Sequence, residues 1–180
     1  MSLPDLINLS GFNGNWDAYV AYCYSVFERE IRDARLTFLD LNVGCRRLPQ
    51  TDGKDYRFWH LVSNSPDANK QEDDRIINLK RCERLRWIPY VLRQAQLKDA
   101  SILCWEKPMK HGESSLHFWL QNHDYLVVLG RRANYFMLTT AFPFEGTEGR
   151  IKSERKAVSK TKCNTSSGIG MMDCFMVDGR

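Results

Sequence analysis

The chain has 180 residues, of which 43% are hydrophobic and 27% are charged. This composition excludes an intrinsically disordered chain, and the length suits one domain with a substantial core. The net charge of +4 permits an anionic partner without requiring one. No run approaches the roughly 18 apolar residues of a membrane-spanning helix, and the N-terminus does not resemble a secretory signal. We therefore expect a cytoplasmic protein with no membrane partner.

The cysteines and histidines do not form the spacings of a metal site. The six cysteines are widely separated and include no CxxC pair. Three of the four histidines recur every six residues near Cys104, namely His111, His117 and His123, but zinc-ligand spacings such as HxxxH are absent. We therefore expect reduced cysteines and no bound metal.

The first third of the chain predicts a long helix followed by a short strand. Apolar residues recur at helical spacing across residues 15–34, which predicts an amphipathic helix capped by Asn13 or Asn15. Residues 36–43 are predicted to form the strand.

The next segments predict a strand that carries a histidine, and then two helices. Residues 56–63 are aromatic and read as a strand, with His60 at its centre on the same face as Phe58. After a polar loop, helices are expected near 78–86 and 89–97, with a proline in the first turn of the second.

The part of the chain after Ser101 predicts a β-meander. Four β-rich runs are joined by the short segments KHGES, NHD and GRRAN, and short joins favour antiparallel pairing because parallel crossovers need a dozen or more residues. The predicted fold class is α+β, with N-terminal helices packed on a four-stranded antiparallel β-meander. Residues 1–150 would form this single domain, and residues 151–180 a basic, flexible tail.

Basic residues concentrate in the predicted helical region. The 24 residues from Arg75 to Lys98 include seven basic residues and one acid, a net charge of +6. Arg81 and Arg84 are three residues apart, so on a helix they share a face and could hold one phosphate together. A merely solvated helix face is the alternative interpretation of this segment.

Further basic residues follow at the turns of the meander and beyond it. Acids are concentrated elsewhere, so the pattern indicates one cationic surface, as in proteins that bind nucleic acid. An interaction protein whose charge only keeps it soluble is the alternative.

Three segments together resemble a known family. They are FWHLVS around His60, the helical RCERLRWIP, and DYLVVLGRRANYFMLTTAFP. In this order they resemble the barnase–EndoU–colicin–RelE (BECR) superfamily of small ribonucleases, in particular a phage- and toxin-associated branch, with a ribonuclease-like core at about 55–150.

The resemblance implies endoribonuclease activity without a metal or other cofactor. The ribose 2′-hydroxyl would attack the adjacent phosphate of tRNA or mRNA, and an acidic antitoxin or immunity protein would be a partner. The resemblance implies that His60 is the general base or acid, that Arg84 with Arg81 stabilises the transition state, and that Thr140 hydrogen-bonds the phosphate. The residues expected to bind RNA are Trp105, Lys107, Arg131, Tyr135 and Arg150.

The sequence leaves three points open. Strand alternation does not decide between Thr139 and Thr140 as the phosphate ligand. The second proton carrier could be His117, Lys107 or Tyr135. A non-catalytic nucleic-acid-binding module that uses the same basic face is the alternative function.

Overall fold

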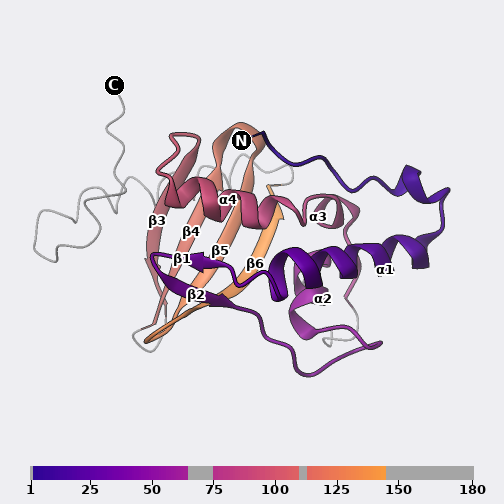
Figure 1. Ribbon diagram of the computed structural model, residues 1–180, viewed down its shortest axis with the longest axis horizontal. Helices are drawn as coiled ribbons and strands as arrows, with labels where there is room; N and C mark the ends of the chain where they lie inside the picture. Colours follow the sequence, from indigo (N-terminus) through magenta and orange to yellow (C-terminus); the bar gives the residue numbers. More distant parts are fainter. Residues whose placement is uncertain (1, 65–74, 110–112, 145–180) are drawn as a thin grey trace, which may run out of the picture.

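We describe a computed structural model of the chain, which places residues 2–64, 75–109 and 113–144. The architecture is α+β, as predicted, with helices packed on a curved six-stranded sheet (Figure 1). The predicted tail at 151–180 lies outside the described residues. No helix within the described ranges is long and apolar enough to span a bilayer.

The N-terminal helix forms where the apolar spacing predicted it. After a short 3-10 turn, η1 (Leu9–Phe12), α1 (Trp16–Phe27) continues into the single π-helical turn η2 (Glu28–Arg32). The Asn15 side chain accepts a hydrogen bond from the Ala18 amide at 3.0 Å, so Asn15 is the N-cap. The buried face of this helix comprises Tyr19, Val20, Cys23, Val26, Phe27 and Ile31.

The sheet has six strands and is mixed, so the prediction of a four-stranded antiparallel meander was wrong in extent. Its strands, in spatial order, are β1 (Thr37–Phe38), β2 (Leu41–Gly44), β6 (Phe136–Pro143), β5 (Tyr125–Arg131), β4 (Ser114–Leu120) and β3 (Ile102–Pro108). β3 to β6 pair antiparallel in chain order, with the 3-10 turn η5 (Gln121–His123) between β4 and β5. β2 adds in parallel to the start of β6, and β1 pairs with β2. Parallel pairing across so many intervening residues leaves no signal in local turn chemistry.

The strand predicted at 36–43 is two short strands. They turn back on each other at Leu39 and Asp40, whose φ angles of 49° and 61° are both left-handed. Two consecutive left-handed residues match the twist of an antiparallel hairpin. The sequence did not predict this turn, because a leucine occupies a position where asparagine or glycine is usual.

Residues 56–63 were predicted as a strand, and this prediction was wrong. They form α2 (Tyr56–Val62). Phe58, Leu61 and Val62 recur at helical spacing and are buried in the core, where the ring of Phe58 contacts Tyr24 and Phe27. A seven-residue apolar segment fits both periods, so tertiary packing decided between them.

The remaining helices lie close to the predicted positions. They are α3 (Leu79–Glu83) and α4 (Trp87–Gln96), and Pro89 is in the first turn of α4, as expected. α4 lies across the sheet, whereas α1, α2 and α3 gather beside β6 (Figure 1). The main core fills the space between these helices and one sheet face. The opposite face carries a smaller cluster, Trp105, Trp119, Leu126, Val128 and Phe142.

Replacement of Phe58 by alanine tests the placement of α2. Phe58 is fully buried, so Phe58→Ala should lower the free energy of unfolding by about 3–5 kcal/mol in urea denaturation. The exposed Leu97 is the control, since Leu97→Ala should change this free energy by less than about 0.5 kcal/mol. A loss below about 1 kcal/mol for Phe58→Ala would contradict the helical packing.

Candidate functional site

A pocket of about 540 Å³ opens beside α2. Its size is in the range of small-molecule and nucleotide sites. Helix α2 contributes three aromatic rings on one side, and the segments before and after α2 contribute the rest. The lining residues are Arg46, Pro49, Thr51, Asp52, Tyr56, Trp59, His60, Arg75 and Ile77.

His60 lies in this pocket, with its ring against Tyr56 and its Nδ1 atom bound to an arginine. The ring centres of His60 and Tyr56, one helical turn apart, are 4.0 Å from each other. Nη2 of Arg75 lies 2.8 Å from His60 Nδ1. Because a guanidinium only donates, Nδ1 must accept, and the neutral ring carries its proton on Nε2.

Four arginines surround this ring pair, and we call Arg46, Arg57, Arg75 and Arg81 the arginine cluster. The guanidinium carbons of Arg46 and Arg57 lie 4.2 Å and 5.9 Å from the centre of the Tyr56 ring. Arg75 binds the His60 ring, and Nη1 of Arg81 lies 3.4 Å from the His60 carbonyl oxygen. The sequence stretches that supply these arginines are up to 35 residues apart, from 46 to 81.

Arg57 is the most unusual member of the cluster because it is buried without an acid. Only 8% of the residue is exposed, and its Nη1 donates to the Thr139 carbonyl. Within the described ranges it forms no ion pair, and its buried Nε has no hydrogen-bond partner. Burial lowers the pKa of Arg57, and the charges of Arg46 and Arg75 lower it further.

A buried cation with no counter-charge destabilises the folded chain unless an anion reaches it. Arg46 also lacks a carboxylate partner among the described residues, since its Nε donates to the Leu48 carbonyl at 2.8 Å. The nearby carboxylate of Asp55 is already shared by Arg32 and Gln50. Arg46 and Arg57 therefore have the electrostatics of an anion site. Sequence reasoning missed Arg57, because a strand at 56–63 placed it outside the catalytic set.

A β-bulge decides the position of the two threonines. Leu138 pairs with Leu129 and Thr140 with Val128, so Thr139 is the extra residue of β6. Thr140 shares the face of Val128, away from the helical core, and Thr139 Oγ1 would lie 3.2 Å from a Cβ at Gly130 on the same face. Both hydroxyls thus lie on one face. Arg57 reaches Thr139 only through the carbonyl oxygen.

The two arginines predicted from the helix have different positions. Arg81 donates to the His60 carbonyl near the C-terminus of α2, where a cation stabilises the helix dipole, and its guanidinium lies 5.2 Å from the centre of the Phe142 ring. Arg84 instead pairs with Glu83 at 2.9 Å and lies over the Trp87 ring. In the part of the chain that is described, no contact joins Arg84 to His60.

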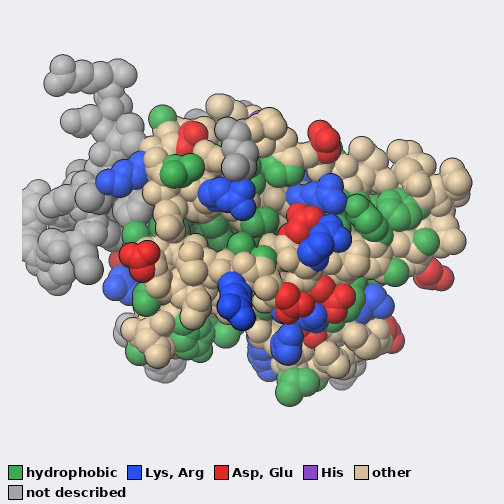
Figure 2. Space-filling view, in the orientation of Figure 1, with side chains coloured by type: hydrophobic (Ala, Val, Ile, Leu, Met, Phe, Trp, Pro, Cys, Tyr) green, Lys and Arg blue, Asp and Glu red, His purple; other side chains and the backbone are tan. Residues whose placement is uncertain are grey.

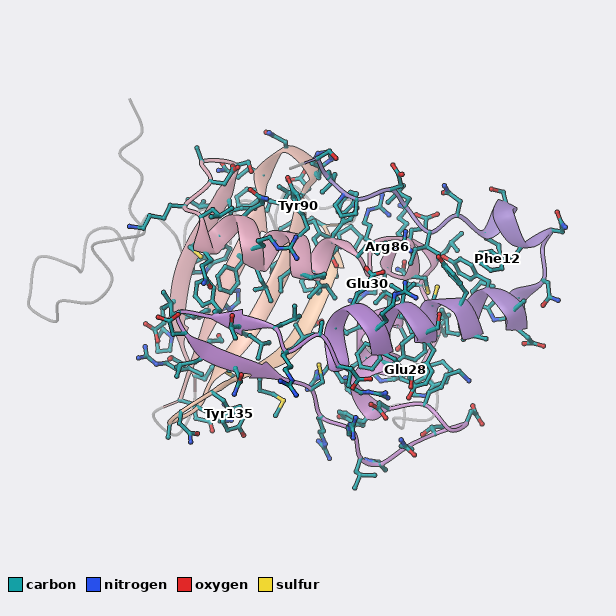
Figure 3. The ribbon with its side chains drawn as sticks, in the orientation of Figure 1. Phe12, Glu28, Glu30, Arg86, Tyr90 and Tyr135 are labelled. Atoms are coloured by element: carbon teal, nitrogen blue, oxygen red, sulfur yellow. The ribbon has the colours of Figure 1, made fainter. Side chains whose placement is uncertain are left out.

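The other predicted site residues are dispersed. Trp105 is 3% exposed and packs on the ring of His117, so it offers no open face to a base in this conformation. Lys107 is exposed, and Arg131 pairs with Glu106 at 3.5 Å. Figure 3 places Tyr135 where β6 begins, away from α2. Arg150 lies outside the described residues.

His117 is buried on the sheet and does not reach the pocket lining. Its Nε2 lies 3.0 Å from the Ser115 hydroxyl. Burial lowers the pKa of His117 to about 4, and the charge of Lys107 contributes to this. A ring that is 8% exposed and neutral at pH 7 is poorly suited to the second proton transfer.

The face viewed in Figure 2 does not form a uniform cationic surface. Acidic and basic side chains are intermingled there. Glu30 and Arg86, labelled in Figure 3, are one such pair at 3.5 Å. Arg46 and Arg57 differ from this pattern, since neither pairs with an acid among the described residues.

Neither metal-binding residues nor similar proteins indicate a function for this chain. Among the described residues, no three histidine, cysteine, aspartate or glutamate side chains are grouped to hold a metal ion. No protein-family model, curated protein or solved structure matches the chain. The functional argument therefore rests on the geometry of the pocket.

The depressed pKa of His117 predicts acid sensitivity. The unfolded state binds the proton below about pH 6.5, whereas the folded state binds it only near pH 4, so stability should fall as the pH decreases between these values. The full difference is about 3 kcal/mol. Urea denaturation at pH 7.5 and 5 should show a smaller loss in His117→Gln than in the parent. Equal losses would contradict the buried, neutral ring.

Proposed function

We propose that the protein is an endoribonuclease that binds RNA at the arginine cluster and cleaves it without a metal. The observation that carries this proposal is that Arg46 and Arg75 line the same pocket as His60, while the buried Arg57, which forms no ion pair with any described residue, lies 5.9 Å from the centre of the Tyr56 ring in that lining. A phosphodiester supplies the missing negative charge, and the aromatic lining suits the rest of a nucleotide.

The chemistry follows from the positions of these groups. The ribose 2′-hydroxyl attacks the phosphorus, the bond to the 5′-oxygen breaks, and a 2′,3′-cyclic phosphate and a 5′-hydroxyl result. The arginine cluster stabilises the charge that develops on the phosphate oxygens. His60 takes the 2′-hydroxyl proton, and Tyr56, whose ring centre lies 4.0 Å from that of His60, donates its hydroxyl proton to the leaving oxygen.

Arg75 controls which form of His60 is available. While Arg75 donates to Nδ1, His60 can offer only its Nε2–H as a hydrogen-bond donor. A bound phosphate attracts the guanidinium of Arg75, because a charge-assisted bond to an anion is stronger than a bond to a neutral ring. Nδ1 is then able to accept a proton, so substrate binding activates the base.

The activity is tested with total RNA and tRNA in excess EDTA. We expect cleavage by the parent and a loss of about 10²–10⁴-fold in His60→Gln. Arg93→Gln is the matched control, since Arg93 is exposed on α4 and should leave the rate unchanged. RNA that remains intact with the parent would exclude the ribonuclease.

One observation favours a second function, an RNA-binding module without catalysis. His60 Nδ1 is already occupied by Arg75, and the pocket lining holds no second histidine. If Arg75 keeps this bond when RNA is present, the pocket binds but does not transfer protons. Intact RNA that is retarded in a gel would support this module, and RNA that is neither cleaved nor retarded would exclude both functions.

Replacement of Arg57 by methionine should weaken RNA binding without lowering the stability of the fold. Removal of a buried, unneutralised charge should leave the free energy of unfolding unchanged or raise it by about 1–2 kcal/mol. The same change should weaken RNA binding at least tenfold, measured by fluorescence anisotropy at fixed salt. The matched variant Arg93→Met should retain the affinity. A strongly destabilised Arg57→Met with normal RNA affinity would make Arg57 purely structural.

A further inference from the structure

The sheet face turned away from the helices carries a second apolar cluster, which we call the outer cluster. It consists of Trp105, Trp119, Leu126, Val128 and Phe142, with Leu103 and Phe144 packed against it. A sheet with one face in water alternates buried and exposed residues. In β4 and in β5, however, six consecutive residues are buried. Both faces of these strands are therefore covered.

No helix within the described ranges contributes to the outer cluster. The buried apolar side chains of the four α-helices all belong to the main core on the other face. The five buried residues of the outer cluster come from β3 to β6, and they are between 2% and 9% exposed. Side chains stand roughly upright on a sheet, so neighbours on the same face shield only the sides of a tryptophan ring. Burial to this degree requires a further segment that lies over the face.

The sequence narrows the choice of this covering segment. Residues 65–74 and 110–112, which lie outside the described ranges, contain no valine, leucine, isoleucine, methionine, phenylalanine, tyrosine or tryptophan. Residues 169–177, IGMMDCFMV, also lie outside these ranges and are apolar at seven of nine positions. The chain leaves β6 on the same face, since the Phe144 ring centre lies 5.8 Å from that of Trp119 and 5.7 Å from that of Phe142.

We propose that residues 169–177 of the same chain dock on the outer cluster and complete a second core on this face of the sheet. The connection from Phe144 has about 25 residues, and a flexible chain of this length has an end-to-end distance of roughly 25–30 Å. Four adjacent strands span only about 15 Å, so the segment reaches the whole face. Because the segment is tethered, it occupies the face in preference to another molecule of similar chemistry.

The side chains of this segment suit a surface that contains two tryptophans. Its three methionines are flexible thioethers, which fill irregular gaps and make favourable contacts with aromatic rings, and Phe175 adds a ring of its own. Two buried ring nitrogens on this face, Trp105 Nε1 and His117 Nδ1, have no hydrogen-bond partner among the described residues. The backbone of a docked segment offers both donors and acceptors to these atoms.

Photo-cross-linking in the full chain tests this docking. Phe175 is replaced by p-benzoylphenylalanine, an aromatic residue that forms a covalent bond with neighbouring C–H groups under ultraviolet light. We expect cross-links within one chain to residues of the outer cluster, located by mass spectrometry. The same probe in place of Lys160, in the polar connection, is the control and should not give them. Cross-links between chains, at the mass of a dimer, would assign the face to a second copy and overturn docking within the chain. The absence of cross-links from position 175 to the outer cluster would overturn it as well.

A second measurement follows the two tryptophans of the outer cluster. In the full chain labelled with 5-fluorotryptophan, each tryptophan gives its own ¹⁹F NMR signal. The double variant Met172→Ser/Phe175→Ser should shift the signals of Trp105 and Trp119 toward that of a hydrated indole. The signal of Trp16, which lies on α1, should not move.

The matched control changes two long side chains in the polar connection. Lys160→Ser/Lys162→Ser should leave all of the ¹⁹F signals in place. Signals of Trp105 and Trp119 that do not move in the Met172→Ser/Phe175→Ser variant would overturn the proposal, because the segment would then not cover the outer cluster. An equal shift in the lysine variant would also overturn it, since the effect would not depend on the apolar side chains.

Discussion

The bond from the Arg57 guanidinium to the Thr139 carbonyl joins α2 to the sheet. Thr139 is the extra residue of the β-bulge in β6, and its carbonyl accepts the hydrogen bond from Arg57. The adjacent side chain of α2, Phe58, is anchored in the core. The helix is therefore held between an apolar contact and a charged one, and this fixes the direction in which Tyr56 and His60 point.

Arg46 and Arg75 make the pocket lining cationic, and the charge of Arg57 acts on both of them from outside that lining. While Arg57 holds the sheet its side chain stays buried, and it forms no ion pair with any of the described residues. Arg46 and Arg75 add to this charge from segments before and after α2. Repulsion between these guanidinium groups lowers the stability of the fold, and a bound anion would reduce that repulsion. This is the physical link between the architecture and the proposed activity.

The sheet contributes to the site in an indirect way. Its helix-facing side is filled by the main core, and the bulge turns both threonine hydroxyls to the other side. His117 lies on that same side as a buried, neutral ring. His117 is thus a buried histidine on a strand. His60 lies on the short helix α2, where its neighbours are aromatic rings and arginines.

The sequence by itself determined the long N-terminal helix with its Asn15 cap, the order of the last four strands and the position of α4, because local periodicity, capping and short joins are properties of neighbouring residues. It also singled out His60. Only the tertiary structure decided that residues 56–62 are helical, that β2 pairs with β6 in parallel, and that Arg75, not Arg84, contacts the His60 ring. These features arise from contacts between distant segments, where packing energy exceeds local propensity, and no local pattern records them.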